Sequence, residues 1–345
     1  MMNNARQTQD LRSVSLADIG EADLLRLLAE VASAASNQSL VVGPGDDAAV
    51  WRSGSAVDVV LTQDAMVEDR DFRRVWITPQ QIGARALHVA LSDIAGMGAR
   101  PAWCLATLCA PGATLLDDVL EIQRGLVAAA RDTGCALVGG DVSDTAGPIV
   151  IDVAVGGTLD GGRCLRRDAG RPGDVLVVTG TMGRAAAGLR ALDGAKLTAS
   201  EPSRTLWEAA LLAPRARIAE GLRLAEAGAR CGGDISDGLA VDAARTADAS
   251  GCAAEVWLDH VPVDPDLRTA FSDAWVDVAL GGGDDFELLA ALSPVVVGDL
   301  LRGWPTHLAP LRIVGRLVEG SGLELLTGEG GDPLAGPVVS SRHWR

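Results

Sequence analysis

Adjacent aspartates after a glycine-rich turn are the first residues in this chain whose types and spacing could do chemistry. Asp46 and Asp47 follow Gly-Pro-Gly and precede an apolar run in the segment VVGPGDDAAVW. Further aspartates, most of them near glycine, stand in the segments LTQDAMVEDRDF, ALSDIAGMGARP, VGGDVSDTAGP, GGDISDGLAVD and LGGGDDFELLA. Glycine and aspartate are also common turn formers, so any one segment alone is equally typical of an ordinary loop. Their repetition favours a shared role.

Aspartates on short glycine loops suit Mg²⁺, which takes oxygen ligands from one or two carboxylates, water and phosphate. Two carboxylates about 4 Å apart repel by roughly 4 kcal/mol at the effective dielectric of a protein surface, so a cluster of them requires cations. If the aspartates converge, several metal ions that carry a polyphosphate would balance their charge. The candidates are Asp46, Asp47, Asp64, Asp93, Asp141, Asp234 and Asp237. The alternative is that they are separate, solvated loop ends.

Other common catalytic arrangements are absent from the sequence. The segment GTMGRAAAG has the glycines of a phosphate-binding turn but lacks the lysine of a P-loop. The four histidines show neither H-E-x-x-H nor paired spacing, so zinc is not predicted. His88 falls in a predicted buried helix, and we interpret it as a core residue rather than a base. The G-x-S-x-G motif of serine hydrolases does not occur.

Net charge argues against two classes of partner. The chain has 46 acidic and 30 basic residues, with a formal net charge of −16. This excess opposes binding to nucleic acid and to anionic membranes. A small phosphorylated metabolite can still bind where cations screen the acidic residues.

The sequence also predicts a cytoplasmic protein. Residues 1–15 lack the apolar core of a signal peptide, and no run of about 18 apolar residues occurs. The six cysteines form no C-x-x-C pair, which fits a reducing compartment. We expect residues 1–14 to form a disordered tail.

Hydrophobic periodicity predicts the elements that position the first aspartates. A helix is predicted at 21–32, a buried strand at 57–64 that ends at Asp64, and a long buried helix from Pro79 to about 98 that carries Asp93. A strand at 101–110, a helix at 115–132 and strands at 135–140 and 148–159 follow. This order predicts an α/β domain over 15–160.

Residues 161–345 are predicted to form a second α/β domain. Strands are predicted around 171–180, 253–258, 285–292 and 311–318, and helices at 181–192, 214–228 and 237–251. The segment DGGRC marks the expected boundary between the two domains.

Seven motifs in fixed order resemble the thiamine-monophosphate kinase family, within the superfamily that includes aminoimidazole ribonucleotide synthetase. They are GDDAAV, TQD, LSDIAGMGARP, GGD, RRDAGRPGD, DISDG and GGGDDFELL, and the resemblance runs from about Gly20 to Val318. It implies a two-domain aminoimidazole ribonucleotide synthetase-like fold of the α/β (α+β) class, with an N-terminal domain that binds ATP and Mg²⁺ and forms a homodimer through its sheet. It also implies direct in-line transfer of the γ-phosphoryl group of ATP to thiamine monophosphate.

The resemblance assigns roles to individual residues. The implied metal ligands are Asp47, Thr62, Asp64, Asp93, Asp141, Asp234 and Asp237, of which Asp64, Asp141 and Asp237 are also the catalytic candidates. The implied nucleotide contacts are Arg167, Ser236, Gly139 and Gly140, and the implied acceptor contacts are Asp71, Asp284 and Trp344.

Three positions depart from the family pattern. Gln63 stands where the family usually has threonine, Asp71 where it has histidine, and Asp284 where it has glutamate. Asp71 can be a solvated loop charge, or it can repel an anionic acceptor unless a metal or one of the neighbouring arginines, Arg70, Arg73 and Arg74, compensates. The donor half of the site is therefore better supported than the acceptor half.

Three other functions remain open from the sequence. A kinase of the same family could act on a different phosphorylated or hydroxylated metabolite. A cyclising ligase fits less well, because DISDG and GGGDDFELL follow the kinase pattern. A noncatalytic nucleotide-binding relic would not require the metal-binding aspartates.

Overall fold

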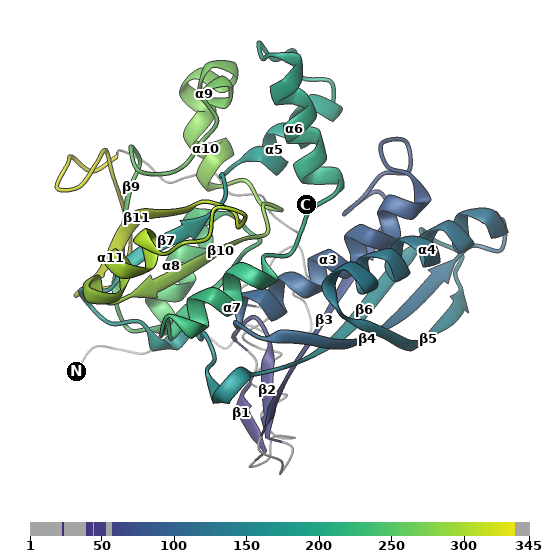
Figure 1. Ribbon diagram of the computed structural model, residues 1–345. Helices are drawn as coiled ribbons and strands as arrows, with labels where there is room; N and C mark the ends of the chain where they lie inside the picture. The colour runs from purple at the N-terminus through teal and green to yellow at the C-terminus, as the bar shows by residue number, and fades with distance from the viewer. Residues whose placement is uncertain (1–22, 24–38, 44, 53–56, 335–345) are drawn as a thin grey trace, which may run out of the picture.

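The computed structural model describes residues 23, 39–43, 45–52 and 57–334. Within these residues the chain forms two α/β domains, each built on a six-stranded mixed sheet (Figure 1). The predicted two-domain α/β fold is therefore confirmed. The predicted tail at 1–14, nearly all of the helix predicted at 21–32, and Trp344 lie outside the described residues.

The first sheet contains all the strands predicted for the N-terminal domain. Its order is β1 (Leu40–Val42), β2 (Ala49–Arg52), β3 (Asp58–Val67), β6 (Val150–Thr158), β4 (Arg100–Ala110) and β5 (Ala136–Asp144). Strands β4 and β5 run parallel, and the other neighbours are antiparallel. Helices α3 (Pro79–Gly96) and α4 (Leu116–Thr133) cover one face of this sheet (Figure 1). The order places β5 at an edge.

Local sequence explains where α3 begins and how closely it packs on α4. Thr78 accepts a hydrogen bond from the backbone of Gln81, whose side chain binds the Thr78 backbone in return, and Pro79 occupies the first helical turn. A side chain at Gly83 would overlap the Ile122 carbonyl oxygen of α4. The helices can therefore approach to backbone contact only with glycine at this position.

The second sheet is covered on both faces. Its order is β12 (Gly322–Leu326), β9 (Ala253–Trp257), β11 (Leu311–Val318), β7 (Val175–Thr179), β10 (Glu287–Leu292) and β8 (Cys231–Ile235). On β7, Val177 packs in one apolar cluster with residues of α7 and α11, whereas Leu176 and Val178 pack in another with residues of α8. The helices are α5 (Arg184–Leu192), α6 (Glu201–Leu212), α7 (Ile218–Glu226), α8 (Leu239–Ala249), α9 (Pro265–Phe271), α10 (Trp275–Leu280) and α11 (Pro294–Arg302).

The last turns of α3 join the two domains. Helix α3 packs against α7 and β8 of the C-terminal domain. A side chain at Gly221 of α7 would overlap the Ala95 carbonyl oxygen, and one at Gly96 would meet both the Asp47 carboxylate and the Asp234 backbone nitrogen. The loop before β2, the end of α3 and the end of β8 therefore meet at one point. None of the helices in the described ranges is long and apolar enough to span a bilayer.

Candidate functional site

Three of the predicted metal-binding aspartates meet at this domain junction, and we call Asp47, Asp93 and Asp234 the acidic cluster. The backbone nitrogen of Asp234 donates to Asp47 Oδ2 at 3.0 Å. On the α3 side, Ser92 Oγ donates to Asp234 Oδ2 at 2.7 Å. Thr62 of β3 donates to Asp93 Oδ2 at 2.5 Å. The side chains of Asp47 and Asp234 are 0% and 2% exposed, so their charges face one another away from water.

Mutual repulsion inside the acidic cluster changes its protonation. Burial, and then the Asp234 and Asp47 carboxylates, hold the pKa of Asp93 well above its usual range. Burial and Asp47 do the same for the pKa of Asp234. Burial, followed by the neighbouring Asp47 charge, raises the pKa of Asp46 to about 6. Without added cations, Asp93 and Asp234 therefore hold a proton more tightly than isolated carboxyl groups do.

Arg167 is the arginine that faces the acidic cluster. Its Nε donates to Asp47 Oδ1 at 2.5 Å, and its terminal nitrogens lie 3.8 Å from Asp234 Oδ1 and 3.8 Å from Asp242 Oδ1. Burial opposes its charge, but Asp47, Asp242 and Asp234 raise the pKa of the guanidinium above its usual value. Arg245 also lies 3.6 Å from Asp242 Oδ1, and these two arginines still leave an excess of carboxylates at the junction.

The donor set at this junction fits divalent cations that bind oxygen. Asp242 Oδ1 is buried and accepts no hydrogen bond. Among the described residues, no three histidine, cysteine or acidic side chains are arranged to hold one ion by themselves. Mg²⁺ usually completes its octahedron with water and substrate phosphates, so clusters of one or two carboxylates suit it.

Asp64 lies between the acidic cluster and a second group of carboxylates. It shares a face of β3 with Thr62, because strand side chains alternate. Burial, and then the charge of Asp71, raise the pKa of Asp64 to about 6, with Asp284 contributing in the same direction. Asp64 in turn raises the pKa of Asp93. The site therefore runs continuously from Asp93 through Asp64 to Asp71.

Asp71 and Asp284 line one small pocket between the domains. Its volume is about 80 Å³, and its wall also includes Trp76 and Arg85. Asp71 Oδ2 accepts a hydrogen bond of 2.7 Å from the Val67 backbone nitrogen, which closes the turn after β3. The structure thus brings two of the three predicted acceptor contacts together, and the third, Trp344, lies outside the described residues.

The arginines near Asp71 differ in their partners. Arg70 and Arg73 line the same pocket as Asp71. Arg73 pairs with Asp193 at 2.7 Å, and Arg74 pairs with Asp118 at 2.8 Å.

Gln63, the third position that departs from the family pattern, lies on the opposite face of β3 from Asp64. Its side-chain nitrogen donates to Asp152 Oδ2 at 2.5 Å.

Ser236 and Asp237 follow β8 in the loop that leads into α8. The Asp237 carboxylate pairs with Arg245, and its backbone nitrogen donates to Asp242 Oδ2 at 3.1 Å. The Ser236 carbonyl accepts a 2.8 Å hydrogen bond from the Asp284 backbone. This loop therefore contacts the segment that carries Asp284.

Asp141 does not join the acidic cluster within one chain. It lies on β5 together with Gly139 and Gly140, exposed to solvent, whereas Asp64 lies on β3. Strands β6 and β4 separate them, so three strand spacings, about 14 Å, lie between the two backbones. Asp141, one of the candidates for the converging aspartates, is therefore separate from the acidic cluster within the chain that the structure describes. A side chain at Gly140 would overlap the Ala106 carbonyl oxygen, so its glycine is required by strand packing.

Arg85 is a site residue that sequence reasoning missed. It lies on buried helix α3, lines the pocket with Asp284, and is 3% exposed. The available signal was an arginine among small and apolar neighbours in a predicted buried helix. Its partner is 199 positions away in the sequence, and no local pattern indicates that partner.

Known protein families match both domains of this chain. Residues 45–159 match the N-terminal domain of AIR synthase related proteins, and residues 171–325 match the C-terminal domain. The thiamine-monophosphate kinase of Bacillus subtilis is 34% identical over 263 residues, which cover 74% of this chain and 79% of the relative.

Two solved structures share the fold over most of the chain. One is a complex, "AaThiL complexed with AMPPCP and TMP", with a TM-score of 0.80 and 28% identity that covers 94% of this chain and 97% of the other. The other is the thiamine-monophosphate kinase of Stenotrophomonas maltophilia, with a TM-score of 0.72 and 35% identity over 86% of this chain and 93% of the other. From the matched domains, the shared fold and this identity, we conclude that the chain belongs to the thiamine-monophosphate kinase family of AIR synthase related proteins.

Proposed function

We propose that this chain transfers the γ-phosphoryl group of ATP directly to the phosphate of thiamine monophosphate and yields thiamine diphosphate, with Mg²⁺ as cofactor. The observation that carries the proposal is that Asp64 lies between the acidic cluster and the pocket that Asp71 and Asp284 line. The charged phosphates of a donor bound at the acidic cluster can therefore meet an acceptor bound in that pocket. Membership of the family supports the choice of both substrates.

In this proposal the acidic cluster holds the metal ions. Asp47, Asp93 and Asp234, with Thr62 and Asp64 beside them, are the ligands for Mg²⁺. When bound, the ions neutralise the phosphate oxygens of ATP. In the same proposal Arg167, which lies 3.8 Å from Asp234 at this junction, contacts the nucleotide phosphates together with Ser236. The charge of Asp47 orients Arg167 before any ligand arrives.

Phosphoryl transfer asks a protein mainly for positioning and charge neutralisation. The phosphate of the acceptor is ionised near neutral pH, so the reaction requires no strong general base. His88 is a poor general base, because burial and then the charge of Arg215 lower its pKa to about 4. Its Nδ1 accepts a 3.4 Å hydrogen bond from the Ala216 backbone, which is a structural role.

A single assay tests the proposal. The purified chain is incubated with ATP and Mg²⁺, with and without thiamine monophosphate, and ADP and thiamine diphosphate are quantified by chromatography. We expect equal amounts of the two products, formed only when the acceptor and Mg²⁺ are both present. ATP binding without turnover of thiamine monophosphate would contradict the acceptor and favour the kinase that acts on another metabolite.

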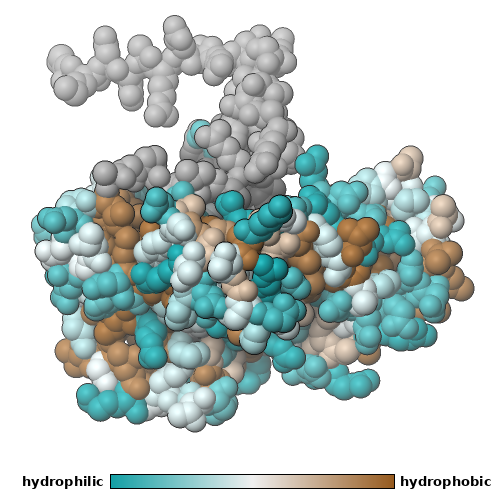
Figure 2. All heavy atoms as spheres, turned by 90° about the horizontal axis from the view of Figure 1, so that it is seen from above, coloured by the Kyte–Doolittle hydropathy of each residue, from teal (hydrophilic) through white to brown (hydrophobic). Residues whose placement is uncertain are grey.

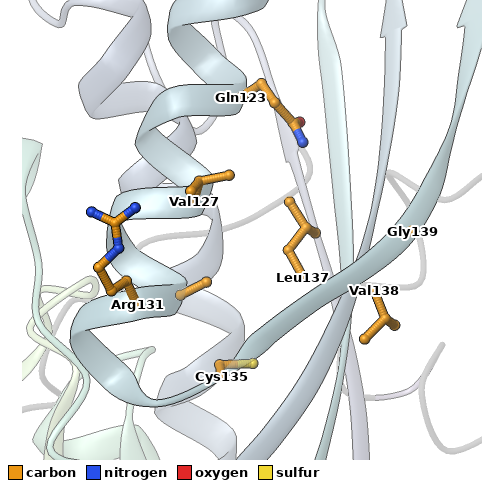
Figure 3. A pocket seen from close by; sticks show the side chains of 8 residues that line it. Gln123, Val127, Arg131, Cys135, Leu137, Val138 and Gly139 are labelled. Atoms are coloured by element: carbon orange, nitrogen blue, oxygen red, sulfur yellow. The ribbon is translucent and has the colours of Figure 1, made fainter.

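We also propose that the protein is a cytoplasmic C2 homodimer paired through residues 57–160. Edge strand β5 supports this, because Val138 is 61% exposed and Val142 is 75% exposed. A groove of about 550 Å³ lies between α4 and β5, where Leu137 points towards α4 and Val138 points away from it (Figure 3). Figure 2 shows hydrophobic residues at the right-hand end of the molecule, where Figure 1 places α4. An exposed apolar edge of this kind is unfavourable unless another strand or chain covers it.

A further inference from the structure

Arg85 is a buried charge that requires explanation. It lies in the middle of α3, and its side chain is 3% exposed. Isolated buried charges are costly, so the partners of the guanidinium decide whether the position is tolerated. Those partners belong to the other domain.

The guanidinium of Arg85 reaches two segments of the C-terminal domain. Its Nη2 lies 2.7 Å from Asp284 Oδ2. Its Nη1 donates to the carbonyl of Leu211, in the last turn of α6. Its Nε has no hydrogen-bond partner among the described residues. The ring of Phe286 lies 5.9 Å from the guanidinium carbon.

The segment that carries Asp284 has an unusual backbone. Asp284 has φ of 69° and Phe286 has φ of 48°, a region that non-glycine residues rarely adopt. The Asp284 nitrogen donates to the Ser236 carbonyl at 2.8 Å, and the Phe286 nitrogen donates to the Ile235 carbonyl at 3.0 Å. These bonds tie the segment to the loop that follows β8. The Asp284 side chain stays 42% exposed, and its carboxylate is held on the other side by Arg85.

We propose that Arg85 is a positioning residue that acts through Asp284. It fixes the direction of the Asp284 carboxylate in the acceptor pocket and holds α3 of the N-terminal domain in register with the segment 281–286. Arginine suits this task because its planar fork can bind a carboxylate and a carbonyl in fixed directions, whereas the single ammonium of lysine cannot. The inference rests on the proposed function in one respect, namely that Asp284 contacts the acceptor.

The test is a double-mutant cycle on the full-length protein with Arg85→Met, Asp284→Asn and the double variant. Arg85→Met keeps most of the aliphatic volume and removes both hydrogen bonds. We expect it to raise KM for thiamine monophosphate about tenfold and to leave KM for ATP within about twofold. In the Asp284→Asn background, which has already lost the ion pair, the same substitution should have a smaller further effect. Arg85→Lys should restore part of the loss.

A matched control removes an arginine ion pair that is remote from the pocket. Arg316 of β11 binds Glu255 Oε2 at 2.8 Å across the second sheet, and Arg316→Met should leave both KM values unchanged. Additive effects of Arg85→Met and Asp284→Asn, or an equal rise in KM for both substrates, would overturn the positioning role.

Hydrogen exchange provides a readout that does not depend on turnover. In Arg85→Met the amides of Asp284 and Phe286 should exchange about tenfold faster than in the wild type, and in Arg316→Met they should not. Unchanged protection would refute the proposal. If the wild type fails to phosphorylate thiamine monophosphate, the proposed function fails, and the exchange measurement still decides the role of Arg85. If Arg85→Met does not fold, Arg85→Lys is compared in the same measurements, and its unchanged KM and protection would overturn the proposal.

Discussion

Replacement of Asp64 by asparagine should stabilise the metal-free protein while it impairs catalysis. Burial and the neighbouring carboxylates raise the pKa of Asp64 from 3.8 to about 6. A raised pKa of an acid means that the folded state binds the proton more tightly than the unfolded state. The ionised carboxylate therefore costs about 3 kcal/mol of folding free energy at most, because each pKa unit corresponds to about 1.4 kcal/mol.

The sign of this effect fixes its dependence on pH. The penalty is absent below the unfolded pKa, grows as pH rises through the folded pKa of about 6, and is complete above it. The advantage of Asp64→Asn should thus reach up to about 3 kcal/mol at pH 7.5 and shrink to about 1 kcal/mol at pH 4.5. Part of it will be lost, because the Ala65 backbone hydrogen-bonds to the carboxylate and the amide is a poorer partner.

Urea unfolding with EDTA at the two pH values measures this difference directly. Added Mg²⁺ should stabilise the wild type more than the variant and narrow the gap, and turnover at saturating ATP should fall by two orders of magnitude or more in the variant, about 3 kcal/mol of transition-state binding. The reasoning is refuted if Asp64→Asn is less stable than the wild type at pH 7.5 without metal, or if the difference does not change with pH.

Three further outcomes are expected from other parts of the site. Asp141→Asn should change the melting temperature by less than about 2 °C, because its carboxylate is exposed on the β5 edge; a large loss of stability would indicate a structural role. Val142→Lys should convert the dimer to a monomer in light scattering at micromolar concentration, and a wild type that is itself a monomer would contradict the dimer. Asp71→His should raise kcat/KM for thiamine monophosphate about tenfold with little change for ATP, by removing one negative charge near the acceptor. Asp71→Asn, which keeps an acceptor for the Val67 nitrogen, is its control, and a fall in both variants would show that the charge assists binding.

The sequence was most informative where local rules determine the structure. Thr78, Pro79 and Gln81 specify the start of α3 through short-range contacts, and the apolar face of that helix is read from a 3.6-residue period. The strand predicted at 57–64 was recognised from its apolar run, although β3 continues to Val67. The meeting of Asp47 with Asp234, by contrast, was expected from motif order rather than from local pattern.

Non-local pairing explains what the sequence could not show. Strand order in a sheet depends on contacts between distant segments, so the glycine-rich segment at Asp141 could not be placed at an exposed edge. Strand β12 pairs in parallel with β9 and was not predicted, because its residues Gly322–Leu326 form only a short apolar run. Arg85 was missed for the same reason. Its role follows from its ion pair with Asp284, which is distant in the sequence, and its neighbours in α3 do not indicate that pair.

Helix α3 also limits how this protein can move. Its last turns touch α7 at Gly221 and the acidic cluster at Gly96, with backbone contacts that leave no room for a side chain. A hinge opening of the two domains would have to break these contacts together with the Arg85–Asp284 ion pair. We therefore expect substrates to enter and products to leave through small rearrangements of the loops around the pocket, while the two domains behave as one rigid body during turnover.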